Sequence, residues 1–151
     1  MKKYESFLYK KVNHYGSVGI VFQYENKVLL VKPANYELFD GWSYPKGNLD
    51  EGEIHKNTAY REVKEEIGVD LPTNFLDNIE LEELTPVLKE KGVKHYWYYK
   101  CDLSTEDFNK YFNNSLIIPK SKLQLDEIDE ARFVDIEEAK KLLSSKFLDI
   151  L

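Results

Sequence analysis

The sequence has one cysteine, no membrane-length apolar run and only two arginines among its 21 basic residues. A single cysteine, Cys101, excludes an internal disulfide framework, so we expect it to pack as a small apolar side chain in a reducing compartment. Nowhere do 18 consecutive apolar residues occur, and the first residues lack the apolar run of a signal peptide. These absences predict a soluble, cytoplasmic protein with no membrane partner.

The charge balance is acidic, with a formal net charge of -6 at pH 7. Because phosphate backbones attract basic surfaces, this balance argues against a non-specific nucleic-acid binder, although the lysines could still form local patches for phosphates. An acidic site usually binds a polyanion through a bound cation that lies between them.

One domain over residues 1–151 is expected. The chain is long enough for one sizeable core, and no repeat, low-complexity segment or Pro/Gly/Ser-rich linker marks a boundary. Hydrophobic patterning predicts strands and helices in mixed order, which is typical of an α/β (α+β) sandwich. The predicted strands cover 16–24, 27–32, 80–90, 93–103 and 131–136, with a short extended stretch at 42–45, and the predicted helices cover 53–67, 104–112 and 136–148.

The stretch "YREVKEEIGV", residues 60–69, gathers three glutamates on one predicted helical turn. Glu62, Glu65 and Glu66 are spaced i, i+3 and i+4, so they share a face and repel one another. An isolated acidic cluster is most often a solvated helical face. Three adjacent carboxylates also suit a hard divalent cation such as Mg²⁺, which prefers oxygen ligands and is commonly shared with substrate phosphates.

The wider stretch "GNLDEGEIHKNTAYREVKEEIGV", residues 47–69, resembles the signature of the Nudix hydrolases, G-x5-E-x7-R-E-U-x-E-E-x-G-U, where U is apolar. The seven fixed letters would match by chance about once in 10⁸ starting positions. The resemblance implies a Nudix-type α/β/α sandwich with a mixed central sheet, in which the signature forms a loop-helix-loop.

The resemblance also implies metal ligands. Glu62, Glu66 and Glu65 would hold Mg²⁺, for which Mn²⁺ can substitute, and the carbonyl of Gly47 would face the same ion. Gly47 and Gly68 are expected to need backbone freedom. The three histidines, by contrast, have no ligand-like spacing, and none is assigned to metal: His14, His55 and His95.

Two further residues of the signature are expected to act on the glutamates. Arg61 precedes Glu65 by four residues, so it can brace that carboxylate. Glu53 is implied to support the fold of the signature, with a catalytic role as the second possibility. An acid in the first helical turn is also stabilised by the helix dipole without any chemistry.

The chemistry implied is hydrolysis of a phosphoanhydride in a nucleoside diphosphate linked to another group. Nudix hydrolases take their general base either from the signature or from a later loop, so Glu65 and Glu127 are both candidates. Glu127, in "LQLDEIDEARFVDI", matches the later loop best. The alternative is that it is one exposed loop acid among several: Asp126, Asp129 and Glu130.

The substrate is predicted from features outside the glutamates. Pro45-Lys46 before Gly47 is similar to the asymmetric diadenosine tetraphosphate hydrolases, so Lys46 is expected to contact a phosphate, with Lys120 and Lys122 as further candidates. Tyr96 and Phe147 match the aromatic pair that holds adenine in those enzymes. The alternatives are that both pack in the core, or that a neighbouring aromatic takes the role: Trp97 or Tyr98.

Three functions follow. The first is a Mg²⁺-dependent pyrophosphohydrolase of dinucleoside polyphosphates such as diadenosine tetraphosphate. The second is the same chemistry on ADP-ribose, a nucleoside triphosphate or an RNA 5′ end, although the acidic balance argues against RNA. The third is a non-catalytic nucleotide sensor, which the complete set of glutamates disfavours.

Overall fold

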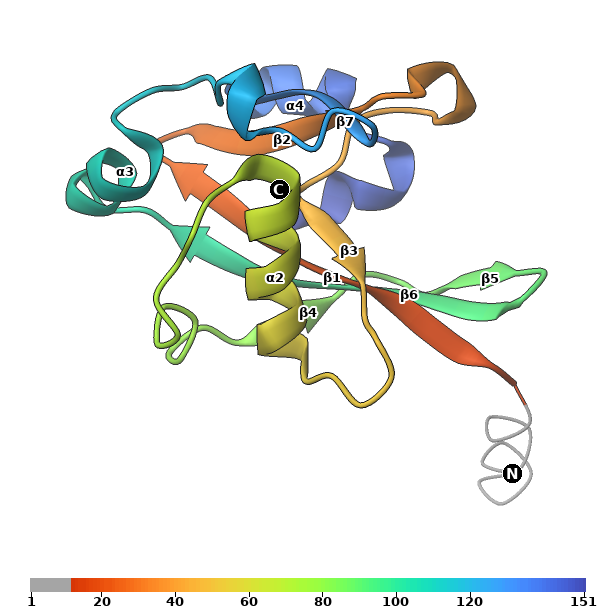
Figure 1. The fold of residues 1–151 in the computed structure, drawn as a ribbon. Coiled ribbons are helices and arrows are strands. Elements are labelled where there is room, and N and C mark those ends of the chain that lie inside the picture. The colour runs from red at the N-terminus through yellow and green to blue at the C-terminus, as the bar shows by residue number, and fades with distance from the viewer. Residues whose placement is uncertain (1–11) are drawn as a thin grey trace.

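The structure is a computed structural model that describes residues 12–151 (Figure 1). Within that range, seven strands form one mixed sheet. The strands are β1 (His14–Tyr24), β2 (Lys27–Pro33), β3 (Lys46–Asn48), β4 (Leu81–Glu83), β5 (Val87–Lys89), β6 (Gly92–Asp102) and β7 (Ile128–Asp135). The helices are α2 (His55–Ile67), α3 (Thr105–Phe112) and α4 (Ile136–Leu142), with short 3₁₀ segments at Tyr36–Leu38, Lys120–Lys122 and Ser145–Ile150.

Strand β1 organises the sheet. The main order is β4-β6-β1-β2-β7, and β3 also pairs with β1 while β5 pairs with β6. β1 and β6 run parallel, whereas the other pairs are antiparallel. The β1–β2 connection is the tight turn expected from the sequence, with Glu25 at φ 54°. The first strand, β1, is therefore held between strands of the first half of the chain and β6 from the second half.

Two apolar layers cover the sheet. Alternate β1 side chains face opposite sides, because Ile20 and Phe22 join one core whereas Val21 joins the other. α2 and α3 pack on the first core, and α4 with Ser145–Ile150 packs on the second. This arrangement confirms the predicted α/β/α sandwich with a mixed central sheet.

Three predicted boundaries are wrong. The signature helix begins at His55, so Glu53 lies before it rather than in its first turn. The predicted helix 136–148 ends at Leu142, because Leu143 turns extended and bridges Trp42 in the segment before β3. The predicted strand 80–90 divides into β4 and β5 around Pro86, which has no N–H to donate to a ladder. No helix within residues 12–151 is both long and apolar enough to span a bilayer.

Candidate active site

Helix α2 carries the acidic residues of the site on the side that its apolar residues leave free. Ala59, Val63 and Ile67 pack into the core, while Glu62 and Glu66 keep only 8% and 7% of their surface exposed. The helix ends at Gly68, whose φ of 68° is left-handed, and this confirms the predicted C-terminal stop. Local sequence therefore sets both the length of the helix and the face that bears the glutamates.

A cavity of roughly 250 Å³ lies beside this face. The three glutamates of α2 line it together with Glu127, which comes from the loop before β7. The backbone N–H of Gln124 donates to the carbonyl of Glu66 at 3.0 Å and so ties this loop to the end of the helix. The structure thus brings together all four glutamates predicted for metal binding or general base: Glu62, Glu65, Glu66 and Glu127.

Burial dominates the electrostatics of the two inner carboxylates. It raises the pKa of Glu66 to about 8, against the opposing effect of the Lys46 ammonium and of the Lys46 N–H, which donates to Glu66 Oε1 at 3.0 Å. Burial also raises the pKa of Glu62. Arg61 opposes this rise, and the charges of Glu65 and Glu127 add to it. The negative charge here is poorly compensated by the protein alone, which favours a bound cation.

Gly47 lies against the carboxylate of Glu62 and lines the same cavity. A Cβ atom at this position would overlap the Glu62 carboxylate. Gly47 is not among the glycines with positive φ, whereas Gly68 is. The expected need for backbone freedom is therefore wrong for Gly47, and what the position requires is space.

The donor set fits a hard divalent cation, because the cavity wall offers carboxylate oxygens held in a partly buried pocket. In the described part of the chain, no three acidic, histidine or cysteine side chains converge closely enough to hold an ion as they stand. Arg61 binds Oε1 of Glu62, and the Lys46 N–H binds Oε1 of Glu66. Binding would require these carboxylates to turn toward a shared point.

Arg61 holds the loop before the helix as well as the glutamates. Its Nε and Nη2 donate to the two oxygens of Glu53, each at 2.9 Å, and its Nη1 donates to Glu62 at 2.8 Å and to Glu65 at 3.3 Å. The contact with Glu65 agrees with the spacing argument, but the two-oxygen pairing with Glu53 is the better formed.

Glu53 lines neither cavity described here. One of its oxygens also accepts from the Thr58 hydroxyl at 2.7 Å, and the hydrogen bonds from Arg61 lower its pKa to about 2. A carboxylate so strongly held as an anion is unsuited to accept a proton near neutral pH. The geometry fits the supporting role implied for Glu53.

The acidic residues at the start of β7 have different contacts from Glu127, which lies just before the strand. Asp129 pairs with Lys32 and Glu130 pairs with Arg132, so both are used outside the cavities. Glu127 is exposed, lines both cavities, and raises the pKa values of Glu62 and Glu66 through its charge.

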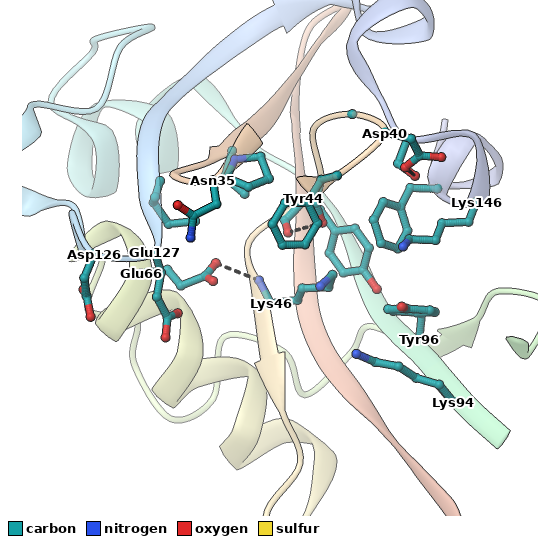
Figure 2. Close-up of a pocket in the computed structure, with 18 of the residues that line it drawn as sticks. Asn35, Asp40, Tyr44, Lys46, Glu66, Lys94, Tyr96, Asp126, Glu127 and Lys146 are labelled. Carbon is teal, nitrogen blue, oxygen red and sulfur yellow. Dashed lines mark hydrogen bonds between the residues drawn. The ribbon is translucent and has the colours of Figure 1, made fainter. Parts of the chain in front are cut away.

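A second, larger cavity of roughly 370 Å³ adjoins the first (Figure 2). The two share four lining residues: Lys46, Glu66, Lys94 and Glu127. Lys46, Tyr96 and Phe147, the three predicted substrate contacts, all line the larger cavity. The structure therefore places the predicted substrate residues next to the predicted metal ligands.

The two aromatic rings contact each other. Tyr96 and Phe147 lie edge to face with centroids 5.0 Å apart, and they are only 3% and 4% exposed. A purine therefore cannot lie between them in this conformation. Of the alternatives, Trp97 joins the opposite core, and Tyr98 packs beside Tyr44.

Three lysines in the larger cavity were missed by the sequence analysis: Lys89, Lys94 and Lys146. A local signal existed for two of them. Lys94 is two residues before Tyr96 on a strand, so it shares that face, and Lys146 adjoins Phe147. Lys120 and Lys122, which were predicted to approach the acidic loop, line neither cavity, and Lys122 instead lies against Gly68.

The histidines come together although their sequence spacing gave no sign of it. His14 Nδ1 and His95 Nε2 share a hydrogen bond of 2.8 Å, and His95 Nδ1 bonds Glu83. His95 and His55 also both pack on Trp97. Neither cavity includes these histidines, which agrees with leaving them out of the metal site.

Known proteins resemble the chain in sequence or in fold. The RNA pyrophosphohydrolase of Campylobacter jejuni subsp. doylei is 39% identical over 49 residues, which is 32% of this chain and 30% of that protein. Among solved structures, a C. elegans Ap4A hydrolase binary complex matches with a TM-score of 0.57 and 19% identity, over 89% of this chain and 86% of that one.

The NUDIX domain of Shewanella oneidensis NrtR, complexed with ADP ribose, matches with a TM-score of 0.60 and 19% identity, over 99% of this chain and 94% of that one. At such identities the structural matches indicate the fold. The sequence also matches the NUDIX domain over residues 13–149. Since this match takes in the whole sandwich and both cavities, the chain belongs to the NUDIX domain family.

Proposed function

We propose that the chain is a Mg²⁺-dependent Nudix pyrophosphohydrolase that cleaves a phosphoanhydride in nucleoside diphosphates linked to another group, and that dinucleoside polyphosphates such as diadenosine tetraphosphate are its substrates. Mn²⁺ can substitute for Mg²⁺. The observation that carries the proposal is the junction of the two cavities at Lys46 and Glu66. There, a glutamate-lined pocket suited to a cation opens into a larger pocket lined by lysines.

The glutamates of α2 would hold the cation. Glu62 and Glu66, with Glu65 and the carbonyl of Gly47, are the residues assigned to Mg²⁺. When bound, Mg²⁺ supplies Lewis-acid stabilisation of the phosphate oxygens that gain charge and promotes attack by water.

The remaining residues position the substrate and handle the proton. Lys46 neutralises a phosphate of the substrate, because its side chain extends into the larger cavity while its backbone is fixed to Glu66. Arg61 keeps Glu62 and Glu65 from rotating freely. Glu127, exposed on the rim of both cavities, accepts the proton of the attacking water, with Glu65 as the alternative base.

A second substrate class has its own support. The curated relative reported above is an RNA pyrophosphohydrolase, and the shared segment covers less than a third of either chain. The lysines of the larger cavity also supply a local positive surface that the net charge of the chain concealed. A triphosphorylated RNA 5′ end is therefore the second candidate substrate.

The test is a substrate panel with separation of the products. The protein is incubated with Mg²⁺ and, in parallel, with diadenosine tetraphosphate, ADP-ribose, a nucleoside triphosphate and a 5′-triphosphorylated oligonucleotide. We expect release of a nucleoside triphosphate and a monophosphate from diadenosine tetraphosphate, and no reaction in the presence of a chelator.

Each other outcome has a definite meaning. Preference for the oligonucleotide assigns the RNA reaction, and preference for ADP-ribose rejects the dinucleoside assignment. Binding without hydrolysis of any of the four compounds would make the chain a nucleotide sensor. Hydrolysis that survives chelation would contradict the metal role of the glutamates.

A further inference from the structure

Three lysine ammonium groups surround the Tyr96–Phe147 pair (Figure 2). Lys46 Nζ lies 5.4 Å from the centroid of each ring. Lys94 Nζ lies 5.1 Å from the Tyr96 ring, and Lys146 Nζ lies 5.7 Å from Tyr96 and 5.2 Å from Phe147. These are distances at which a cation interacts with an aromatic ring. The two rings therefore form a common platform for three positive charges that come from β3, β6 and the last 3₁₀ segment.

The charges on this platform are not neutralised by salt bridges. None of the ion pairs in the described part of the chain involves Lys46, Lys94 or Lys146. Burial lowers the pKa values of Lys94 and Lys146, and repulsion from Lys89 lowers both further. An anion bound at the platform would relieve this repulsion.

Two carboxylates oppose the positive charge of the cluster. Glu66 acts on Lys46, although burial still lowers the pKa of Lys46 to about 8, and Asp40 acts on Lys146. Asp40 lines the same cavity, but its carboxylate accepts a short hydrogen bond from the Ser144 hydroxyl. This bond lowers the pKa of Asp40 and fixes the loop before β3 to the chain that follows α4. Asp40 is thus already engaged at the edge of the cavity.

The platform offers no slot for a base. The rings of Tyr96 and Phe147 are buried and in mutual contact, and Phe147 also packs edge to face on Tyr44 at 5.6 Å. Separating them to admit a purine would break core contacts. A phosphate group, in contrast, can bind the ammonium groups with the rings left as they are.

We infer that Lys94 and Lys146, together with Lys46, form an anion subsite over the Tyr96–Phe147 platform that binds a phosphate of the substrate other than those at the bond cleaved. As a statement about the substrate, this inference rests on the proposed function. It predicts that the enzyme prefers substrates with three or more phosphate groups. ADP-ribose, which has two, should therefore be a poor substrate.

Calorimetric titration with inorganic pyrophosphate in the presence of a chelator tests the subsite without hydrolysis. We expect the unaltered protein to bind pyrophosphate, and the double variant K94Q/K146Q to bind it at least about tenfold more weakly, because two charged hydrogen-bond donors are lost. The matched control is K110Q/K141Q, which removes the same charge from two exposed helical lysines that line neither cavity, and its affinity should be unchanged.

The single variant K146Q tests the subsite even if the double variant K94Q/K146Q fails to fold. Lys146 belongs to neither apolar core, so K146Q leaves the core intact and should by itself weaken pyrophosphate binding. Equal affinity in K94Q/K146Q and the control would overturn the inference, as would the absence of pyrophosphate binding by the unaltered protein. Binding of uncharged adenosine in place of pyrophosphate would assign the platform to a base instead.

The subsite and the hydrolase can fail separately. Pyrophosphate binding that depends on Lys94 and Lys146, in a protein that hydrolyses no anhydride, would leave the subsite standing and reject the proposed function. Hydrolysis of diadenosine tetraphosphate with an unchanged kcat/KM in K94Q/K146Q would support the proposed function and reject the subsite.

Discussion

The carboxylate of Glu62 lies against Gly47 and fills the space that a side chain at position 47 would occupy. Strand β3 reaches this position by pairing with β1, where Gly47 is opposite Val18. The contact joins the first residue of the Nudix signature to its helix. It also explains why the signature needs a glycine at a position whose backbone any residue could adopt.

Substituting Gly47 with alanine should therefore act through Glu62. The new methyl group would displace a side-chain terminus rather than backbone, so the free energy of unfolding should change by only about 1 kcal/mol. The displaced carboxylate should lower kcat about 100-fold, as misplacement of a catalytic group does. Steady-state kinetics and urea denaturation measure the two effects.

Gly52 supplies the matched control. It has a positive φ of 78° with open space around the position of an added Cβ, so G52A strains the backbone without displacing the carboxylate of Glu62. We expect G52A to cost about 1 kcal/mol of stability and to keep its activity. Equal loss of activity in the two variants would contradict the role given to the Gly47–Glu62 contact.

Glu66→Gln should abolish metal-dependent hydrolysis while the fold persists. The glutamine carbonyl can still accept the Lys46 N–H, and glutamine resembles the protonated carboxyl that the raised pKa of Glu66 favours without metal. We expect kcat to fall by about three orders of magnitude and the thermal midpoint in chelator to stay level or rise. A large drop in that midpoint would show that the ionised carboxylate supports the metal-free fold.

Glu127→Gln tests the general base. If Glu127 takes the proton from water, kcat should fall about 10²- to 10⁴-fold, and the acidic limb of the pH–rate profile should disappear. Asp129→Asn is the control, because Asp129 is two residues from Glu127, at the start of β7, but pairs with Lys32. An unchanged pH–rate profile in Glu127→Gln would transfer the role to Glu65.

Glu53 should give the protein a distinctive dependence of stability on pH. Its pKa falls from 4.5 to about 2 in the folded protein, mainly through the hydrogen bonds from Arg61. A carboxyl with a depressed pKa adds stability that is complete above pH 4.5 and is lost as the pH falls toward 2. Glu53→Gln should thus be less stable than the unaltered protein by about 2 kcal/mol at pH 7.

This stability difference should shrink between pH 4.5 and 2, as measured by urea denaturation at a series of pH values. Glu51→Gln, a change at an exposed neighbour, should show no such difference. A gap between Glu53→Gln and the unaltered protein that stays constant down to pH 2 would reject the Arg61–Glu53 pairing as its source.

Cys101 should report unfolding. Its side chain is 2% exposed in β6, and burial raises the pKa of its thiol to about 12, so almost no thiolate is present at pH 8. We expect an aromatic disulfide reagent to label native protein only as fast as the chain opens, and urea above the unfolding midpoint to accelerate the labelling. Rapid labelling of the native protein would contradict this burial.

The parts of the site that lie close together in the sequence were predictable. The i, i+3, i+4 spacing places three glutamates on one helical face, and Gly68 ends that helix, because both features depend on local backbone geometry. The mixed sheet was also predictable from patterning together with the signature.

Features that depend on tertiary contacts were not predictable in the same way. The lysine cluster arises because β6 lies parallel to β1 and because the chain after Leu142 leaves its helical path to bridge Trp42. The sequence after Leu142 still has helical propensity, but the tertiary bridge between Leu143 and Trp42 ends the helix there. The contact between Tyr96 and Phe147 likewise follows from packing, so a pairwise sequence match could not distinguish a base clamp from a closed platform.

The parallel pairing of β1 with β6 also limits the order in which the protein can fold during its synthesis on the ribosome. β1 and β2 emerge together as a hairpin, and the acidic helix follows soon after. The parallel partner of β1 is synthesised much later, and closing so long a loop is slow. Until then one edge of β1 has no partner and is a potential site of aggregation. A nascent chain therefore carries Lys46 and its acidic helix well before Lys94 and Lys146, and its substrate cavity is complete only after Phe147 has been synthesised.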